Sequence, residues 1–96
     1  DRMLFELRPA LLDELGLIPA LRWYVAQMSD VWGFPIEFEG AKVGRLPDHI
    51  ELAAFRIVQE AVSNAARHAK PSRVRVRVGL REGRLHLAHP NSGQAK

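Results

Sequence analysis

A long stretch without glycine or proline in the second half of the chain sets the strongest limit on the fold. Residues 56–69 read RIVQEAVSNAARHA and consist of good helix formers, so they should be helical. Pro47 or Asp48 suits the first turn of this helix and Pro71 ends it, which predicts a helix from about residue 47 to Ala69. Five apolar residues recur at helical spacing and predict its buried face: Ile57, Val58, Ala61, Val62 and Ala65.

A second face of the same helix carries an unusual set of polar side chains. Glu60, Asn64 and His68 recur every four residues and so line up, with Arg56 and Arg67 at the border. Carboxylate and amide oxygens suit Mg2+, and arginine and histidine suit phosphate, so the row could hold a hydrated cation and a polyphosphate. The same spacing is typical of a solvated helix face with local hydrogen bonds, and that is its commoner meaning. From the spacing alone, both interpretations stay open.

The remaining elements mix helices and strands. The patterns predict, in chain order, helices at residues 10–15 and 17–28, a strand at 36–39, and strands at 74–80 and 85–89 on either side of a turn. Gly16 is expected to end the first of these helices, and Pro19 is tolerated in the first turn of the second. This order predicts an α+β fold, a two-layer sandwich with helices on one face of a mixed or antiparallel sheet.

Composition narrows the possible classes of protein. The chain has 96 residues, of which 47% are apolar, enough for one small domain. It contains no cysteine, which excludes disulfides and thiolate metal sites, and no apolar run approaches the length of a membrane span. We therefore expect a soluble, cytoplasmic domain, with any membrane anchor elsewhere in a parent protein. The formal charge of +3 favours anionic partners such as nucleotide phosphates, nucleic acid or an acidic protein surface.

Arginines alternate with valines along the predicted hairpin. The basic stripe consists of Arg73, Arg75, Arg77, Arg81 and Arg84. A nucleic acid would suit this stripe, but no aromatic residue interleaves with it, so the solvated outer face of a sheet is the preferred interpretation. His86 and His89 have no acid or cysteine beside them, which favours surface or strand-end histidines over metal ligands.

Three stretches together resemble the ATP-binding part of bacterial sensor histidine kinases. The likeness is to the subfamily in which a short dimerisation domain precedes an ATPase domain of the gyrase, Hsp90, histidine kinase and MutL type. Residues 7–9 (Leu-Arg-Pro) and 15–17 (Leu-Gly-Leu) are similar to that family's junction between the two domains. Residues 56–69 are similar to its N box, and residues 83–95 to the strand and turn of its first glycine box. The resemblance covers nearly the whole chain.

The resemblance implies a fold and a division of the chain. The fold would be a truncated two-layer sandwich of the Bergerat ATPase type, without the lid and the second glycine box. Residues 1–16 would be the end of a dimerisation helix with the junction, and residues 17–96 a partial catalytic domain. A set of apolar residues in the junction would then be exposed and pack on a partner segment: Leu4, Phe5, Leu11 and Leu12.

The resemblance also implies roles for the polar row. Glu60 would match the catalytic acidic residue of the N box, whose carboxylate orients or deprotonates groups near the phosphate and its water. Asn64 would coordinate the Mg2+ that bridges the ATP phosphates, since Mg2+ keeps its waters and needs few protein ligands. Arg67 and His68 would contact phosphate, with Arg56 as a weaker candidate for the same role. Such a site would act by positioning and charge neutralisation, as phosphoryl transfer requires.

The first glycine box departs from the family pattern, Asp-x-Gly-x-Gly. The best register places Asn91, Gly93 and Ala95 at the three fixed positions. The Asn91 carbonyl can still accept a hydrogen bond from the adenine amino group, at a cost of about 1 kcal/mol relative to aspartate. Ala95 would crowd a backbone that needs the freedom of glycine. A register with His89 at the aspartate position spoils the strand alternation and ranks lower.

These expectations define a leading function and two alternatives. The parent protein would be a homodimeric histidine kinase that uses Mg-ATP to phosphorylate a histidine on its dimerisation domain and passes the phosphate to a response regulator. None of His49, His68, His86 and His89 matches the acceptor position, so this part of the chain would not phosphorylate itself. The first alternative is a degenerate regulatory module without ATP turnover, which Asn91 and Ala95 favour. The second, less favoured, is a basic nucleic-acid-binding domain; the leading function expects no nucleic acid.

Overall fold

A computed structural model describes residues 10–68, 74–82 and 84–88 of the chain. The elements, in chain order, are a short helix at residues 10–15, α2 (Leu17–Trp32), β1 (Ile36–Gly40), α3 (Asp48–His68), β2 (Val74–Arg81) and β3 (Arg84–Ala88). Each helix and strand predicted above is therefore confirmed. The largest difference in bounds is in α2, which continues to Trp32 instead of ending near Met28.

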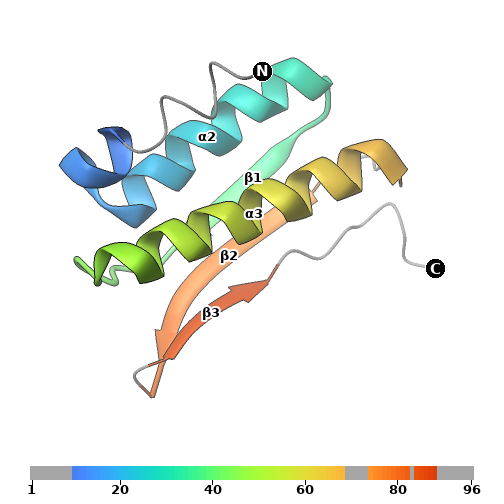
Figure 1. The fold of residues 1–96 in the computed structure, drawn as a ribbon. Helices are drawn as coiled ribbons and strands as arrows, with labels where there is room; N and C mark the ends of the chain where they lie inside the picture. The colour runs from blue at the N-terminus through green and yellow to red at the C-terminus, as the bar shows by residue number, and fades with distance from the viewer. Residues whose placement is uncertain (1–9, 69–73, 83, 89–96) are drawn as a thin grey trace.

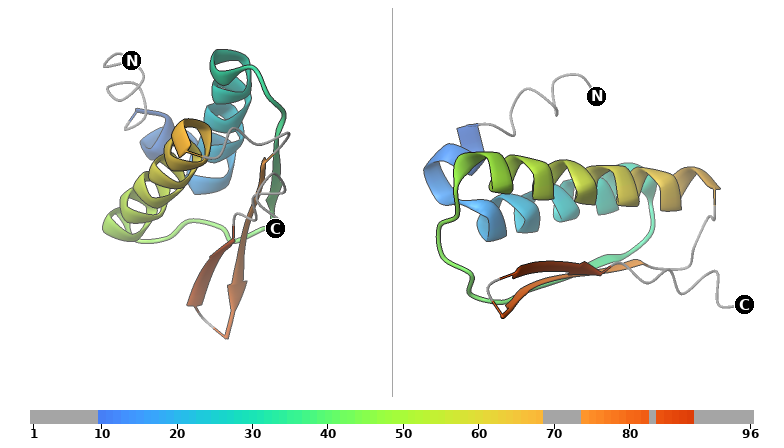
Figure 2. Two further views of the ribbon diagram at one scale, coloured as in Figure 1. Left: turned by 90° about the vertical axis from the view of Figure 1, so that its right-hand side faces the viewer. Right: turned by 60° about the horizontal axis from the view of Figure 1, so that its bottom comes forward.

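The three strands form one mixed sheet with the order β1-β2-β3. β1 runs parallel to β2, with Ile36 opposite Val74 and Gly40 opposite Val78, and β2 runs antiparallel to β3. α3 connects the two parallel strands and crosses over the sheet, and both long helices lie on the same face (Figures 1 and 2). Because β3 reverses the direction of β2, it runs in the same direction as α3 (Figure 1).

Local signals explain where the helices begin and end. Gly33 ends α2 in the left-handed conformation with φ of 83°, and its N–H donates to the Ser29 carbonyl at 3.0 Å. At the start of α3, the Pro47 carbonyl accepts the N–H groups of Ile50 and Glu51 at 2.9 and 3.0 Å. Acidic Asp48 and Glu51 lie in the first turn, where the helix dipole favours negative charge.

The core lies between the helices and the inner face of the sheet. Phe55 of α3 is fully buried, and its ring meets the Tyr24 ring of α2 edge to face with centroids 5.4 Å apart. The residues of the core with less than 2% exposure include Leu17, Leu21, Val62, Val74 and Val76. The inner residues of β2 alternate with outward-facing arginines, as the period of a half-buried strand requires.

Two sequence predictions about buried faces are wrong. Ile57 is 52% exposed, because the buried face of α3 is centred on Phe55, Val58 and Val62 and not on the stripe that includes Ile57. Leu12 is only 5% exposed and joins the same core as α2 and α3, so it is not part of an exposed junction face. Leu11 is partly buried, and Leu4 and Phe5 lie outside the described residues.

Candidate functional site

The C-terminal half of α3 carries an exposed row of polar side chains. Glu60, Asn64 and Arg67 are all exposed, while Val58, Val62 and Ala66 of the same helix are buried in the core. This division follows from the helical period, because residues three and four apart share a face. The sheet and the core therefore hold one side of α3 fixed and leave the predicted row open to a ligand.

Arg67 forms hydrogen bonds with two neighbouring side chains at the centre of this row. Its Nη2 donates to the side-chain oxygen of Asn64 at 3.1 Å, and its Nη1 donates to the Ser63 hydroxyl at 3.3 Å. The structure therefore brings together two of the predicted site residues, an amide oxygen and a guanidinium. An amide oxygen has two lone pairs, so Asn64 can accept from Arg67 and still have acceptor capacity for a cation.

The charge of Glu60 affects the ionisation of Tyr24 on the neighbouring helix α2. Tyr24 of α2 is 6% exposed, and burial raises the pKa of its hydroxyl from 10.0 to about 12, with the negative charge of Glu60 as the second cause. The carboxylate of Glu60 therefore lies near enough to the Tyr24 hydroxyl to influence its ionisation. Tyr24 stays protonated in the physiological range.

The other predicted site residues are only partly covered by the structure. Arg56 is exposed one turn before Glu60. His68 is the last residue of α3, but its side chain, like Asn91 and Gly93, lies outside what the structure describes. β3 ends at Ala88 and runs in the same direction as α3, whose C-terminal half contains Asn64 and Arg67 (Figure 1).

The donor set of the row fits a cation that keeps most of its water. No group of three or more histidine, cysteine, aspartate or glutamate side chains suited to a metal ion occurs among the described residues. Mg2+ in nucleotide sites typically takes only one or two protein oxygens together with phosphate oxygens and waters. The single exposed amide oxygen of Asn64 matches that requirement better than it matches a metal held by protein alone.

Two of the three arginines of the basic stripe whose side chains the structure describes are paired with acids. Arg75 donates to Glu37 and Arg77 to Glu39, each at 3.1 Å, because the parallel register sets these residues opposite one another. These pairs are what the solvated outer face of a sheet is expected to show. Arg73 lies outside the described residues, as does the side chain of Arg84.

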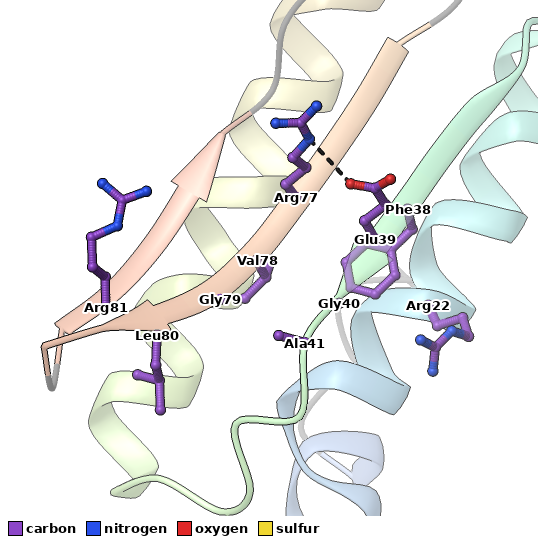
Figure 3. A pocket seen from close by; sticks show the side chains of 10 residues that line it. All are labelled: Arg22, Phe38, Glu39, Gly40, Ala41, Arg77, Val78, Gly79, Leu80 and Arg81. Carbon is purple, nitrogen blue, oxygen red and sulfur yellow. Dashed lines mark ion pairs between the residues drawn. The ribbon is translucent and has the colours of Figure 1, made fainter.

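A hollow lies beside the ends of β1 and β2. It has a volume of about 610 Å³, and it is lined by the paired Arg77 and Glu39 and by Arg22 of α2, whose guanidinium lies 5.5 Å from the centre of the Phe38 ring (Figure 3). No local sequence pattern indicates this hollow, since the packing of the elements that carry Arg22 and Phe38 depends on tertiary contacts.

A buried acid at the N-terminus of α3 was not predicted from the sequence. Glu51 is 2% exposed and bonds to Arg45, which in turn bonds to the carbonyls of Leu12 and Asp13. An acid in the first turn of a helix was a visible signal, but its partner on the loop was not.

Comparison with known proteins gives clear similarity over almost the whole chain. The chain is 37% identical over 94 residues to the signal transduction histidine-protein kinase/phosphatase DegS of Brevibacillus brevis, a match that includes 97% of this chain. It is 36% identical over 91 residues to the protein of the same name from Bacillus subtilis (strain 168), a match that includes 91% of this chain. These similarities relate the chain to sensor histidine kinases.

The matched region is a limited part of those relatives. The chain spans 24% of the length of each of these two histidine kinase/phosphatases. No family model matches the chain, and no solved structure matches it. In the part of the chain that the structure describes, no helix is long and apolar enough to cross a bilayer.

Proposed function

We propose that the chain is an ATP-binding portion of a sensor histidine kinase, and that Mg-ATP binds over the C-terminal half of α3. The observation that carries the proposal is the exposed row in which Arg67 is bonded to Asn64, within a chain that resembles histidine kinases over 97% of its length. The core fixes the opposite side of the helix, so the row is presented on a rigid element. The proposed fold is the Bergerat type, with residues beyond β3 adding to the same site.

Each residue of the row has a chemical role in this proposal. Asn64 would supply one oxygen to Mg2+, and the bound metal would neutralise phosphate charge. Arg67 carries its charge within 3.1 Å of that oxygen, so it would contact a phosphate attached to the same metal. Glu60 is exposed on the same face and would orient a water or a proton near the phosphates. His68, Asn91 and Gly93 would complete the phosphate and adenine contacts.

For the longer protein, we propose the histidine-protein kinase activity that the relatives' names state, with the transfer steps that the sequence resemblance implies. It would transfer the γ-phosphate of ATP to a histidine on a dimerisation domain and then to a response regulator, acting as a homodimer. The alternative of a degenerate module depends on Asn91 and Ala95, which lie outside the described residues. The nucleic-acid alternative gains no support, because Arg75 and Arg77 are paired with glutamates.

Calorimetry with Mg-ATP tests the proposed site. We expect the wild-type chain to bind ATP in the presence of Mg2+ and to bind it at least about tenfold more weakly when Mg2+ is removed or when Asn64→Ala removes the ligand oxygen. Arg67→Ala should also weaken binding, whereas Arg81→Ala, at an exposed arginine of β2, is the matched control and should not. Equal binding by wild type and Asn64→Ala would contradict the proposed metal contact.

A further inference from the structure

The buried Glu51 and the half-exposed Arg45 form an ion pair that the proposed nucleotide site does not use. The Glu51 side chain is 2% exposed, and Arg45 donates to its carboxylate through Nε and Nη2, each at 3.4 Å. The backbone N–H of Leu46 donates to the same carboxylate at 3.2 Å. A carboxylate this deeply buried is stable only with such partners, so the position of Arg45 is tied to the first turn of α3.

The same guanidinium also contacts the short helix at residues 10–15. Its Nη2 donates to the carbonyl of Leu12 at 3.2 Å and to that of Asp13 at 3.4 Å. Gly16 follows with φ of 91°, and a Cβ at this position would lie 3.0 Å from Cδ of Arg45. The Arg45 side chain therefore lies against the bend between the short helix and α2, a bend that only glycine adopts without strain.

We propose that Arg45 and Glu51 act as a latch that couples the docking of residues 10–16 to the N-terminal turn of α3. One guanidinium bonds to both parts, although they are more than 30 residues apart in the sequence. Moving the short helix away breaks the bonds of Arg45 to the Leu12 and Asp13 carbonyls, which hold the guanidinium in place beside the buried carboxylate of Glu51. The latch thus makes residues 10–16 and the first turn of α3 order and loosen together. This coupling adds to the one that the apolar contacts of Leu12 provide.

The coupling extends to the proposed ligand through α3 itself. Glu51 lies in the first turn of the helix that also carries Glu60 and Asn64, so ordering of one end favours ordering of the other. By reciprocity, a ligand that stabilises the C-terminal half of α3 also stabilises the docked position of residues 10–16. This step rests on the proposed function, whereas the latch itself does not.

Amide hydrogen exchange without ligand tests the latch. The double variant Arg45→Met/Glu51→Gln removes both charges and leaves no buried carboxylate without its arginine, so it should be less destabilised than Arg45→Met alone. We expect exchange at residues 10–16 and in the first turn of α3 to be about tenfold faster than in wild type, with a much smaller change at residues 58–66. The control Arg77→Met/Glu39→Gln removes an exposed ion pair of the sheet and should leave residues 10–16 unchanged. Unchanged exchange at 10–16 in the latch variant, or equal acceleration throughout the core, would overturn the proposal.

The same experiment with Mg-ATP tests the coupling to the ligand site. Binding should slow exchange at residues 10–16 in wild type, and this slowing should be lost in the latch variant even at saturating Mg-ATP. If Mg-ATP slows exchange at 10–16 equally in both proteins, Arg45 and Glu51 do not transmit the effect and the coupling is refuted. If Mg-ATP does not bind wild type, the proposed function fails while the comparison without ligand still decides on the latch.

Discussion

The pKa of Tyr24 is sensitive to Glu60, because the carboxylate on α3 acts on the Tyr24 hydroxyl on α2. The phenol is buried against Phe55, and the row residue Glu60 adds a negative charge that disfavours the phenolate. Both causes raise the pKa of Tyr24, and burial is the larger. Tyr24 is the one tyrosine in the sequence, so its ionisation can be followed without interference from another phenol.

Titration of the phenolate absorbance therefore tests the position of Glu60. We expect a pKa of about 12 in wild type. Glu60→Gln should lower it, while burial keeps it above 10.0, and the control Glu39→Gln on the sheet should leave it unchanged. An unchanged pKa in Glu60→Gln would place the carboxylate away from Tyr24.

The same shift predicts how stability depends on pH. The folded state holds the Tyr24 proton more tightly than the unfolded state, so this contribution to the free energy of unfolding is complete below pH 10. It is lost as the pH rises from 10 toward 12. Denaturant unfolding should show this decline in wild type, and Tyr24→Phe should remove the part that this proton causes. An identical decline in Tyr24→Phe would show that other groups are responsible.

β1 and β2 each contain a glycine, and their surroundings differ sharply. A Cβ at Gly40 would lie 2.7 Å from Cε2 of Phe38 and 2.8 Å from Cγ2 of Ile18, so α2 and the aromatic ring leave no room for it. At Gly79 the nearest atom would be Cβ of Ala41 at 3.7 Å, an ordinary contact. Close approach of α2 to the end of β1 therefore depends on Gly40.

Matched alanine variants test this packing. Gly40→Ala should destabilise the domain by about 1–3 kcal/mol, because α2 or Phe38 must move to admit the methyl group. Gly79→Ala should cost less than about 0.5 kcal/mol or stabilise the strand slightly, since alanine restricts the unfolded chain. Denaturant midpoints measure both, and equal effects of the two variants would contradict the packing of α2 on β1.

Sequence patterns predicted the elements of this fold well and their facing surfaces less well. The alternation of Val74, Val76 and Val78 and the proline that follows α3 specify a strand and a helix end by local physics. The predicted buried face of α3 was rotated by about one residue position from the observed one. Ile57 and the alanines of this helix fit two adjacent apolar stripes, and only tertiary packing decides which stripe is buried. The exposed row was predicted from spacing and resemblance, but the contacts of Arg45 with Leu12 and Asp13 join segments more than 30 residues apart and leave no local signal.

At the scale of the whole molecule, one core joins residues 10–15 to both long helices and the sheet. Leu12, Leu17, Phe55 and Val76 belong to a single buried cluster. A domain of this size has a small margin of stability, about 5–15 kcal/mol, so one large cavity removes much of it. The rigidity of the exposed row on α3 therefore depends on the core beneath it.

Two alanine substitutions on α3 distinguish the effect of a buried side chain on stability from that of an exposed one. Phe55→Ala removes a fully buried ring and should cost about 3–5 kcal/mol in the free energy of unfolding. Ile57→Ala, two residues later and 52% exposed, should cost about 0.5 kcal/mol or less. Thermal or denaturant unfolding gives both values. A large loss for Ile57→Ala would mean that this face of α3 is covered in solution.

The central claim is that Mg-ATP binds on the exposed row of α3, and mapping by nuclear magnetic resonance tests its location directly. Backbone amide shifts would be recorded with and without Mg-ATP. We predict the largest changes at residues 60–68 and in the residues that follow β3, with much smaller changes for Asn64→Ala at the same concentrations. Changes confined to the hollow of Arg22, Arg77 and Arg81, or no change at saturating Mg-ATP, would contradict the account.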